Sequence, residues 1–166
     1  MADITKLLVE KKPELIEEQD IYGRTALHYA ASYDAVELVN NRGQNAFHVC
    51  IGKARVGVLD CLMSKVRDDE VLNQQDNEGN TPLHLAVKIG NPKLVESMLE
   101  KEGRVDIDTM NNDNFTPLDL TLRREDASME EIQVYGHLRD AGAKFGIVEP
   151  FNEKDWDLVN AQKDRC

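Results

Sequence analysis

Short apolar segments with helical spacing alternate with polar turns along most of this chain. Val56, Leu59 and Met63, for example, recur at the interval that places side chains on one face of a helix. The same pattern predicts three successive pairs of helices, each pair with a first and a second helix only a few residues apart. The predicted pairs are 46–52 with 55–65, 82–88 with 92–100, and 117–123 with 129–141. The pattern therefore predicts an all-α fold.

A single phrase is written four times, at 23–28, 43–48, 79–84 and 114–119, and its third copy reads GNTPLH. The last three copies each run into the first helix of one predicted pair. Each part of the phrase has a local physical role. Glycine tolerates the positive φ of a tight turn, threonine caps the helix through its hydroxyl, and proline fits the first helical position. Asn114 replaces glycine in the fourth copy, and we expect the turn to persist because asparagine also tolerates a left-handed conformation.

This repetition resembles the ankyrin-repeat family, whose units follow the pattern D-x-x-G-x-T-P-L-H. The resemblance covers about residues 4–142 and implies a solenoid of helix-turn-helix units with short β-turn or hairpin tips. It gives about four repeats, the first of them truncated. The expected boundaries are a repeat domain at 1–142, divided into a partial repeat or cap at 4–19, a truncated repeat at 20–39 and repeats at 40–75, 76–110 and 111–142, and then a C-terminal tail or cap at 143–166.

The first repeat is short, because His28 and His48 lie only 20 residues apart, whereas an ankyrin unit has about 33. The difference amounts to roughly one helix. Two alternatives stay open: a single longer helix from Thr25 to about Val39, or a helix supplied by a second chain. The chain is accordingly expected to be a monomer or a helix-swapped dimer. The chain is expected to begin in the middle of a repeat. This partial repeat would be either a native cap or the remainder of a longer protein from which the chain is a fragment.

The charge of the chain limits the classes of partner to expect, and its cysteines indicate the cellular compartment. The chain carries 31 acidic and 20 basic residues, a formal net charge of −11. Such a balance argues against nucleic acid or an anionic membrane surface as the main partner. The three cysteines lack a metal-ligand spacing, which favours reduced thiols and a cytoplasmic location. The sequence has no secretory signal and no apolar run long enough to cross a membrane.

The histidines invite a metal or catalytic interpretation, but His28, His48 and His84 occupy the same position of successive repeats. The family resemblance implies that this histidine bonds near the threonine and joins adjacent turns. Equivalent residues of stacked helices lie about 10 Å apart, too far for one zinc ion to bridge. No glycine-rich phosphate loop or nucleophile elbow is present. The sequence predicts neither enzyme activity nor a cofactor.

The family resemblance implies a concave face lined by turn tips and by the exposed ends of the inner helices. Aromatic and cationic side chains gather at these positions of an otherwise acidic chain, and such side chains are frequent interface hot spots. We therefore predict that this face binds another protein, one that offers acidic groups. An alternative is that Tyr33 and Ile89 pack between repeats. The predicted partner-binding residues are Tyr22, Arg24, Ser32, Tyr33, Arg42, Gln44, Lys53, Asn77, Glu78, Asn80, Lys88, Ile89, Asp113, Phe115, Arg123 and Arg124.

A closer resemblance rests on residues 73–86, which read NQQDNEGNTPLHLA, and on the related phrase at 41–48. Both are similar to plant ankyrin proteins, many of which carry a C-terminal membrane domain with a Pro-Gly-Gly motif. That resemblance implies defence signalling, a cytosolic repeat array and a defence-related or pathogen protein as partner. Membrane helices of that kind do not occur in this sequence. The alternative to a free-standing interaction module is therefore a regulatory array excised from, or related to, a membrane-anchored signalling protein.

Overall fold

The computed structural model describes residues 39–100, 103–123 and 128–146. Several sequence-based expectations fall outside these residues. They are the N-terminal cap at 4–19, the truncated repeat at 20–39 apart from its last residue, with its longer or swapped helix, and nearly all of the predicted tail at 143–166. These expectations stay predictions.

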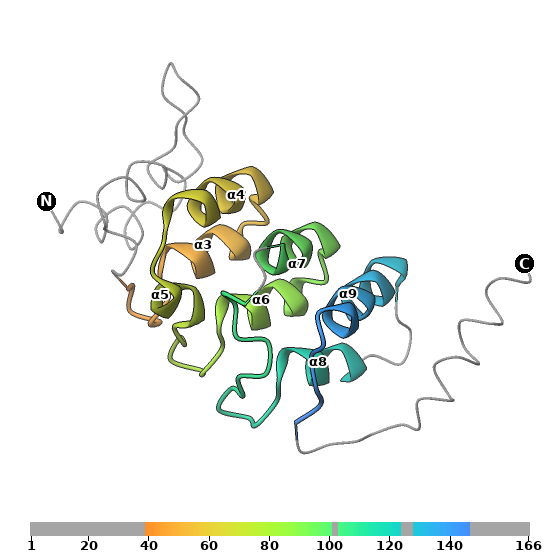
Figure 1. The fold of residues 1–166 in the computed structure, drawn as a ribbon. Coiled ribbons are helices and arrows are strands. Elements are labelled where there is room, and N and C mark those ends of the chain that lie inside the picture. Colours follow the sequence, from red (N-terminus) through yellow and green to blue (C-terminus); the bar gives the residue numbers. More distant parts are fainter. Residues whose placement is uncertain (1–38, 101–102, 124–127, 147–166) are drawn as a thin grey trace, which may run out of the picture.

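Three pairs of helices follow one another in the described part of the chain, which contains no strand (Figure 1). They confirm the predicted pairs to within a few residues. Each pair begins with a helix whose first turn lies within the repeated phrase. The pairs are α3 (Ala46–Gly52) with α4 (Val56–Lys65), α6 (Pro82–Ile89) with α7 (Pro92–Leu99), and α8 (Pro117–Leu120) with α9 (Met129–Asp140). The segment predicted as helix 117–123 is α-helical only to Leu120 and continues as a 3-10 turn, Thr121–Arg123.

One short helix, α5 (Asp69–Asn73), was not predicted. The carboxylate of Asp68 accepts a hydrogen bond from the Glu70 backbone N–H at 2.9 Å and so caps its first turn. Val71 and Leu72 are buried against the core. Five residues make little more than one turn, which is too short for the periodicity that identified the other helices.

The helices form two rows (Figure 1). The first helices of the pairs, α3, α6 and α8, lie side by side in the inner row, and α4, α7 and α9 form the outer row. The core lies between the rows, where Leu59, Leu83 and Leu94 are completely buried. Each repeat therefore buries its apolar face only by stacking on its neighbours, as expected for a solenoid.

Turn tips of adjacent repeats are joined by backbone and side-chain hydrogen bonds. The backbone N–H of Asn77 donates to the Arg42 carbonyl at 2.9 Å, and its side-chain amide donates to the Asn41 carbonyl at 3.0 Å. One repeat later, Asn112 donates in the same way to the carbonyls of Glu78 and Asn77, both at 3.1 Å. These bonds fix the spacing of the turns that precede the inner helices.

Arg104 joins two repeats on the outer side of the stack. Its guanidinium donates to the carbonyls of Val66 at 2.7 Å and Met63 at 3.3 Å, at the C-terminal end of α4. It also pairs with Asp69 at 2.7 Å. Because the last carbonyls of a helix have no partner within the helix, Arg104 satisfies groups that α4 alone leaves unpaired.

Candidate functional site

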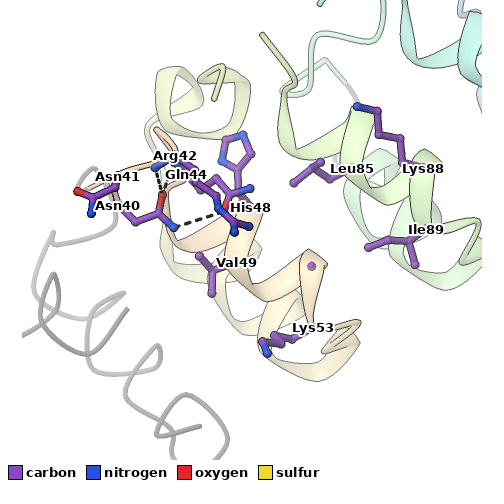
Figure 2. Close-up of a pocket in the computed structure, with 11 residues that line it drawn as sticks. Asn40, Asn41, Arg42, Gln44, His48, Val49, Lys53, Leu85, Lys88 and Ile89 are labelled. Carbon is purple, nitrogen blue, oxygen red and sulfur yellow. Dashed lines mark hydrogen bonds between the residues drawn. The ribbon is translucent and has the colours of Figure 1, made fainter. Parts of the chain in front are cut away.

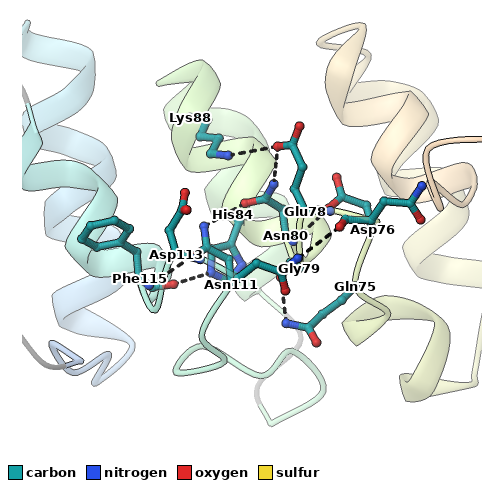
Figure 3. A network of polar contacts seen from close by, with 12 residues as sticks. Gln75, Asp76, Glu78, Gly79, Asn80, His84, Lys88, Asn111, Asp113 and Phe115 are labelled. Carbon is teal, nitrogen blue, oxygen red and sulfur yellow. Dashed lines mark hydrogen bonds and ion pairs between the residues drawn. The ribbon is translucent and has the colours of Figure 1, made fainter.

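Two repeat histidines hold successive turns together. The ring Nε2 of His84 donates to the Phe115 carbonyl at 3.0 Å, and Nδ1 lies 2.8 Å from the Thr81 hydroxyl (Figure 3). The equivalent His48 donates from Nε2 to the Asn80 carbonyl at 2.9 Å. Burial lowers the pKa of both imidazoles below the ordinary histidine value, which keeps them neutral near pH 7. The predicted stitching role is confirmed for these two histidines, whereas His28 lies outside the described residues.

Asp119 occupies the same position in the fourth copy and reverses the direction of the bond. Its carboxylate accepts from the backbone N–H of Thr116 at 2.8 Å and from that of Gly146 at 3.1 Å. A histidine there would donate to a carbonyl of the next turn, as His84 does. Aspartate therefore fits this position because the backbone after the fourth copy presents to it an N–H group, that of Gly146, and not a carbonyl.

A groove on the inner row lies between α3 and α6 and opens toward the turn that precedes α3 (Figure 2). Residues from two successive repeats line it, so neither repeat forms it alone. It brings together five of the predicted partner-binding residues, Arg42, Gln44, Lys53, Lys88 and Ile89. The other lining residues are Asn40, Asn41, His48, Val49, Gly52 and Leu85.

The apolar part of the groove comes from the helices. Val49 and Leu85 are half-buried, and Ile89 is 41% exposed. Val49 and Leu85 directly follow the repeat histidines, so they occupy equivalent positions of successive units. The list of predicted binding residues omitted both, although aligning the repeats would have shown that this position is apolar in each. Ile89 points into the groove in Figure 2, so its packing between repeats is incomplete.

The polar part of the groove is basic. Arg42 extends from the turn, Lys53 follows the end of α3, and Lys88 stands in the last turn of α6; all three are exposed. Among the described residues that line the groove there is no aspartate or glutamate. Glu78 approaches from the neighbouring turn tip, with 3.8 Å between its carboxylate and the Lys88 ammonium (Figure 3). That pair is exposed, with Glu78 at 79%, so it holds Lys88 only weakly.

Asn80 does not belong to the binding surface, and its prediction as an outward-facing residue was wrong. Its side chain is 0% exposed. The Asn80 amide donates to Glu78 at 3.1 Å, and its oxygen accepts from the Asn111 amide at 3.0 Å (Figure 3). The next repeat covers this position, which a view of one repeat in isolation does not reveal.

The other predicted residues either do not line the groove or lie outside the described part. Asn77, Glu78 and Asp113 are exposed at turn tips, but Asn77 uses its amide to join the turns. Phe115 is half-buried at the last turn. Tyr22, Arg24, Ser32, Tyr33 and Arg124 lie outside the described residues, and for Arg123 the structure describes only the backbone, in the 3-10 turn.

Reactive groups are sparse in the described residues, where no group of three or more His, Cys, Asp and Glu side chains could hold a metal ion. The Cys50 thiol is buried, and burial raises its pKa to about 12, which suppresses the reactive thiolate. Cys61 is partly exposed. Among the helices described, none combines the length and the apolar character that a membrane crossing requires.

Comparisons with known proteins consistently find ankyrin repeats. The sequence profile described as ankyrin repeats (3 copies) matches residues 47–129, and a single ankyrin repeat matches residues 22–41. A solved ankyrin-repeat domain from Acinetobacter baumannii AYE aligns with a TM-score of 0.57 over 78% of this chain and 70% of that one. At 20% identity this likeness concerns the fold alone.

Two relatives illustrate where similar sequences occur. The probable 26S proteasome regulatory subunit p28 of Saccharomyces cerevisiae is 25% identical over 146 residues, 88% of this chain and 53% of that protein. The human transient receptor potential cation channel subfamily A member 1 is 32% identical over 101 residues, 53% of this chain and 9% of that protein. The chain thus spans about half of the first relative and a small part of the second.

Proposed function

This chain belongs to the ankyrin-repeat family, and from that premise we propose that it is a non-catalytic module that binds a partner protein through the groove between α3 and α6. Ankyrin repeats are generally protein–protein interaction modules, and the relatives include a regulatory subunit. Fold membership alone does not locate a binding site, so the groove itself must support the assignment.

The observation that carries the proposal is the composition of the groove. Apolar side chains from two repeats lie beside three exposed cations, and the framework groups around them are already engaged. His48, for example, lines the groove but commits its ring nitrogens to Asn45 and Asn80. Val49 and Leu85 pack partly against the core but keep surface exposed in the groove, and Arg42, Lys53 and Lys88 are exposed. These side chains supply the apolar and cationic groups that protein interfaces use.

An affinity pulldown from the source tissue, with the bound proteins identified by mass spectrometry, supplies the partner for the test. Its affinity is then measured for the wild type and for a triple alanine variant of Arg42, Lys53 and Lys88. We expect at least about a tenfold loss of affinity with an unchanged melting temperature. A matched variant with alanine at three exposed cations outside the groove, Arg67, Lys93 and Lys144, should bind like the wild type. Unchanged affinity in a folded groove variant contradicts the proposal.

The plant resemblance of residues 73–86 supports a narrower version, in which the module acts in the cytoplasm in defence signalling and its partner is a defence-related or pathogen protein. The identities of the captured partners test the pathway, and a fluorescent fusion expressed in the source tissue tests the location. Recovery of only unrelated housekeeping partners, or a fusion confined to another compartment, contradicts this version.

A second candidate is a regulatory array within a membrane-anchored signalling protein. It is favoured by the similarity to a short part of a cation channel and by the plant proteins in which such arrays precede a membrane domain. An antibody against this array, applied to separated membrane and soluble fractions of the source tissue, distinguishes the two. A membrane-bound product much larger than 18.8 kDa favours the second candidate, and a soluble product of that mass favours the first.

A further inference from the structure

The partner's chemistry can be specified further, on the basis of the function proposed for the groove. We infer that the groove between α3 and α6 takes an acidic peptide segment of the partner, with one apolar side chain flanked by aspartate or glutamate. The apolar side chain rests on Val49, Leu85 and Ile89, and the flanking carboxylates meet the cations at the groove's edge. Three properties of the groove support this assignment.

The first property is a local reversal of charge. The whole chain carries 31 acidic against 20 basic residues, whereas the described residues lining the groove include three bases and no acid. Arg42 and Lys53 take no part in the ion pairs found within the described residues, and Lys88 has only its exposed pair with Glu78. Surface cations on an acidic protein ordinarily lie close to carboxylates, so this groove presents a positive potential that an anionic segment would complement.

The second property is a change of charge along the turn tips of the described residues. Arg42 directly precedes Gly43 in the second turn, but the equivalent positions of the next two turns hold Glu78 and Asp113, both exposed. The turn tips thus change from basic to acidic along the stack. A segment whose carboxylates lie beside Arg42 therefore avoids the like charges at the later turns, which fixes where on the concave face it sits.

The third property is the apolar floor. Ile89 is 41% exposed and, with the half-buried Val49 and Leu85, leaves an apolar patch between two helices. Covering such a patch with one apolar side chain removes its surface from water, which a purely anionic ligand would not do. The apolar floor favours a ligand that offers an apolar side chain, and the net charge of −11 disfavours densely charged polyanions more than a short acidic peptide. Together they favour a peptide over a nucleic acid strand or an anionic membrane surface.

A random peptide library displayed on phage, selected on the whole chain, tests the inference directly. We expect enriched peptides to share an apolar residue flanked by Asp or Glu. The enriched peptide is then synthesised with glutamine in place of each acidic residue, and separately with serine in place of the apolar residue. Each change should weaken binding at least about tenfold. Binding of the acidic peptide should also weaken between about 50 and 300 mM salt.

Charge reversal in the protein provides the matched control. The variant Arg42→Glu/Lys53→Glu/Lys88→Glu should lose binding of the acidic peptide, whereas Arg67→Glu/Lys93→Glu/Lys144→Glu changes net charge equally and should retain it within about twofold. Circular dichroism confirms that each variant is folded. Single-stranded RNA and phosphatidylserine vesicles serve as the competing anions.

The outcomes separate this inference from the proposed function. Enriched peptides without acidic residues, whose binding is lost in the groove variant, overturn the acidic assignment and leave the groove as a binding site. Enriched peptides whose binding is unchanged in the groove variant overturn both. Tighter groove-dependent binding of RNA or vesicles than of any peptide also overturns the inference. An acidic, apolar consensus whose binding depends on the groove cations supports it.

Discussion

Replacing Gly79 by alanine tests how closely adjacent repeats approach. Gly79 has φ +75°, and a Cβ built there would lie 2.6 Å from the backbone nitrogen of Asn112 and 2.5 Å from its side-chain oxygen. Atoms cannot approach so closely, and the backbone of the neighbouring turn cannot yield without moving the turn. The substitution therefore combines an unfavourable backbone conformation with a clash between repeats.

The magnitude follows from two contributions. An L-residue held at positive φ costs about 1 kcal/mol relative to glycine. Moving the Asn112 turn also weakens its two hydrogen bonds to the Glu78 and Asn77 carbonyls, each worth about 1 kcal/mol. We expect Gly79→Ala to lower the free energy of unfolding by about 2–3 kcal/mol.

Gly90→Ala is the matched control. Its φ of +72° is nearly the same, but the nearest neighbour of an added Cβ is a flexible Glu131 side-chain carbon at 3.5 Å. This variant should lose only the backbone contribution, about 1 kcal/mol. Urea denaturation followed by circular dichroism gives both values, provided that the transition stays two-state. If Gly79→Ala and Gly90→Ala lower the free energy of unfolding equally, the close approach of the Asn112 turn does not constrain position 79.

Three further predictions concern other contacts. Arg104→Ala should lower the free energy of unfolding by about 1–3 kcal/mol in urea denaturation because carbonyls of α4 lose their donor, whereas Asp69→Ala, which removes an exposed carboxylate, should cost less than about 1 kcal/mol. Because burial lowers the pKa of His84, the unfolded chain binds more protons below pH 6.5. The free energy of unfolding should therefore fall as the pH drops below that value. The urea midpoint should fall less steeply with decreasing pH in His84→Gln than in the wild type; an identical pH dependence contradicts this. Iodoacetamide at pH 8 should modify Cys61 in the native protein but Cys50 only after unfolding, as peptide mass spectrometry would reveal; native labelling of Cys50 contradicts its burial.

The turn glycines show where sequence and structure contribute separately. The sequence predicted that Asn114 could replace glycine, and its φ of +63° confirms this. What the sequence did not reveal is why Gly43 and Gly79 stay glycine. Both face the backbone of the next turn, whereas no further copy of the phrase follows Asn114. The left-handed conformation is a local property, but the need for a missing side chain arises between repeats.

The helix pairs and the roles of the capping residues could be predicted from the sequence alone, because turns, caps and helical spacing depend on residues a few positions apart. Thr81 and His84, for example, form within one turn of helix the bonds that their spacing predicts. The helix α5 was missed because it is too short to show a period.

Which of the candidate residues share one surface became visible only in the folded structure. Arg42 and Lys88 lie 46 positions apart in the chain yet line one groove, Val49 and Leu85 join them there, and Asn80 is buried by the repeat that follows it. The exposure of a side chain in a stacked protein depends on the neighbouring repeat, about 33 residues away in the sequence. A local sequence pattern therefore cannot predict it.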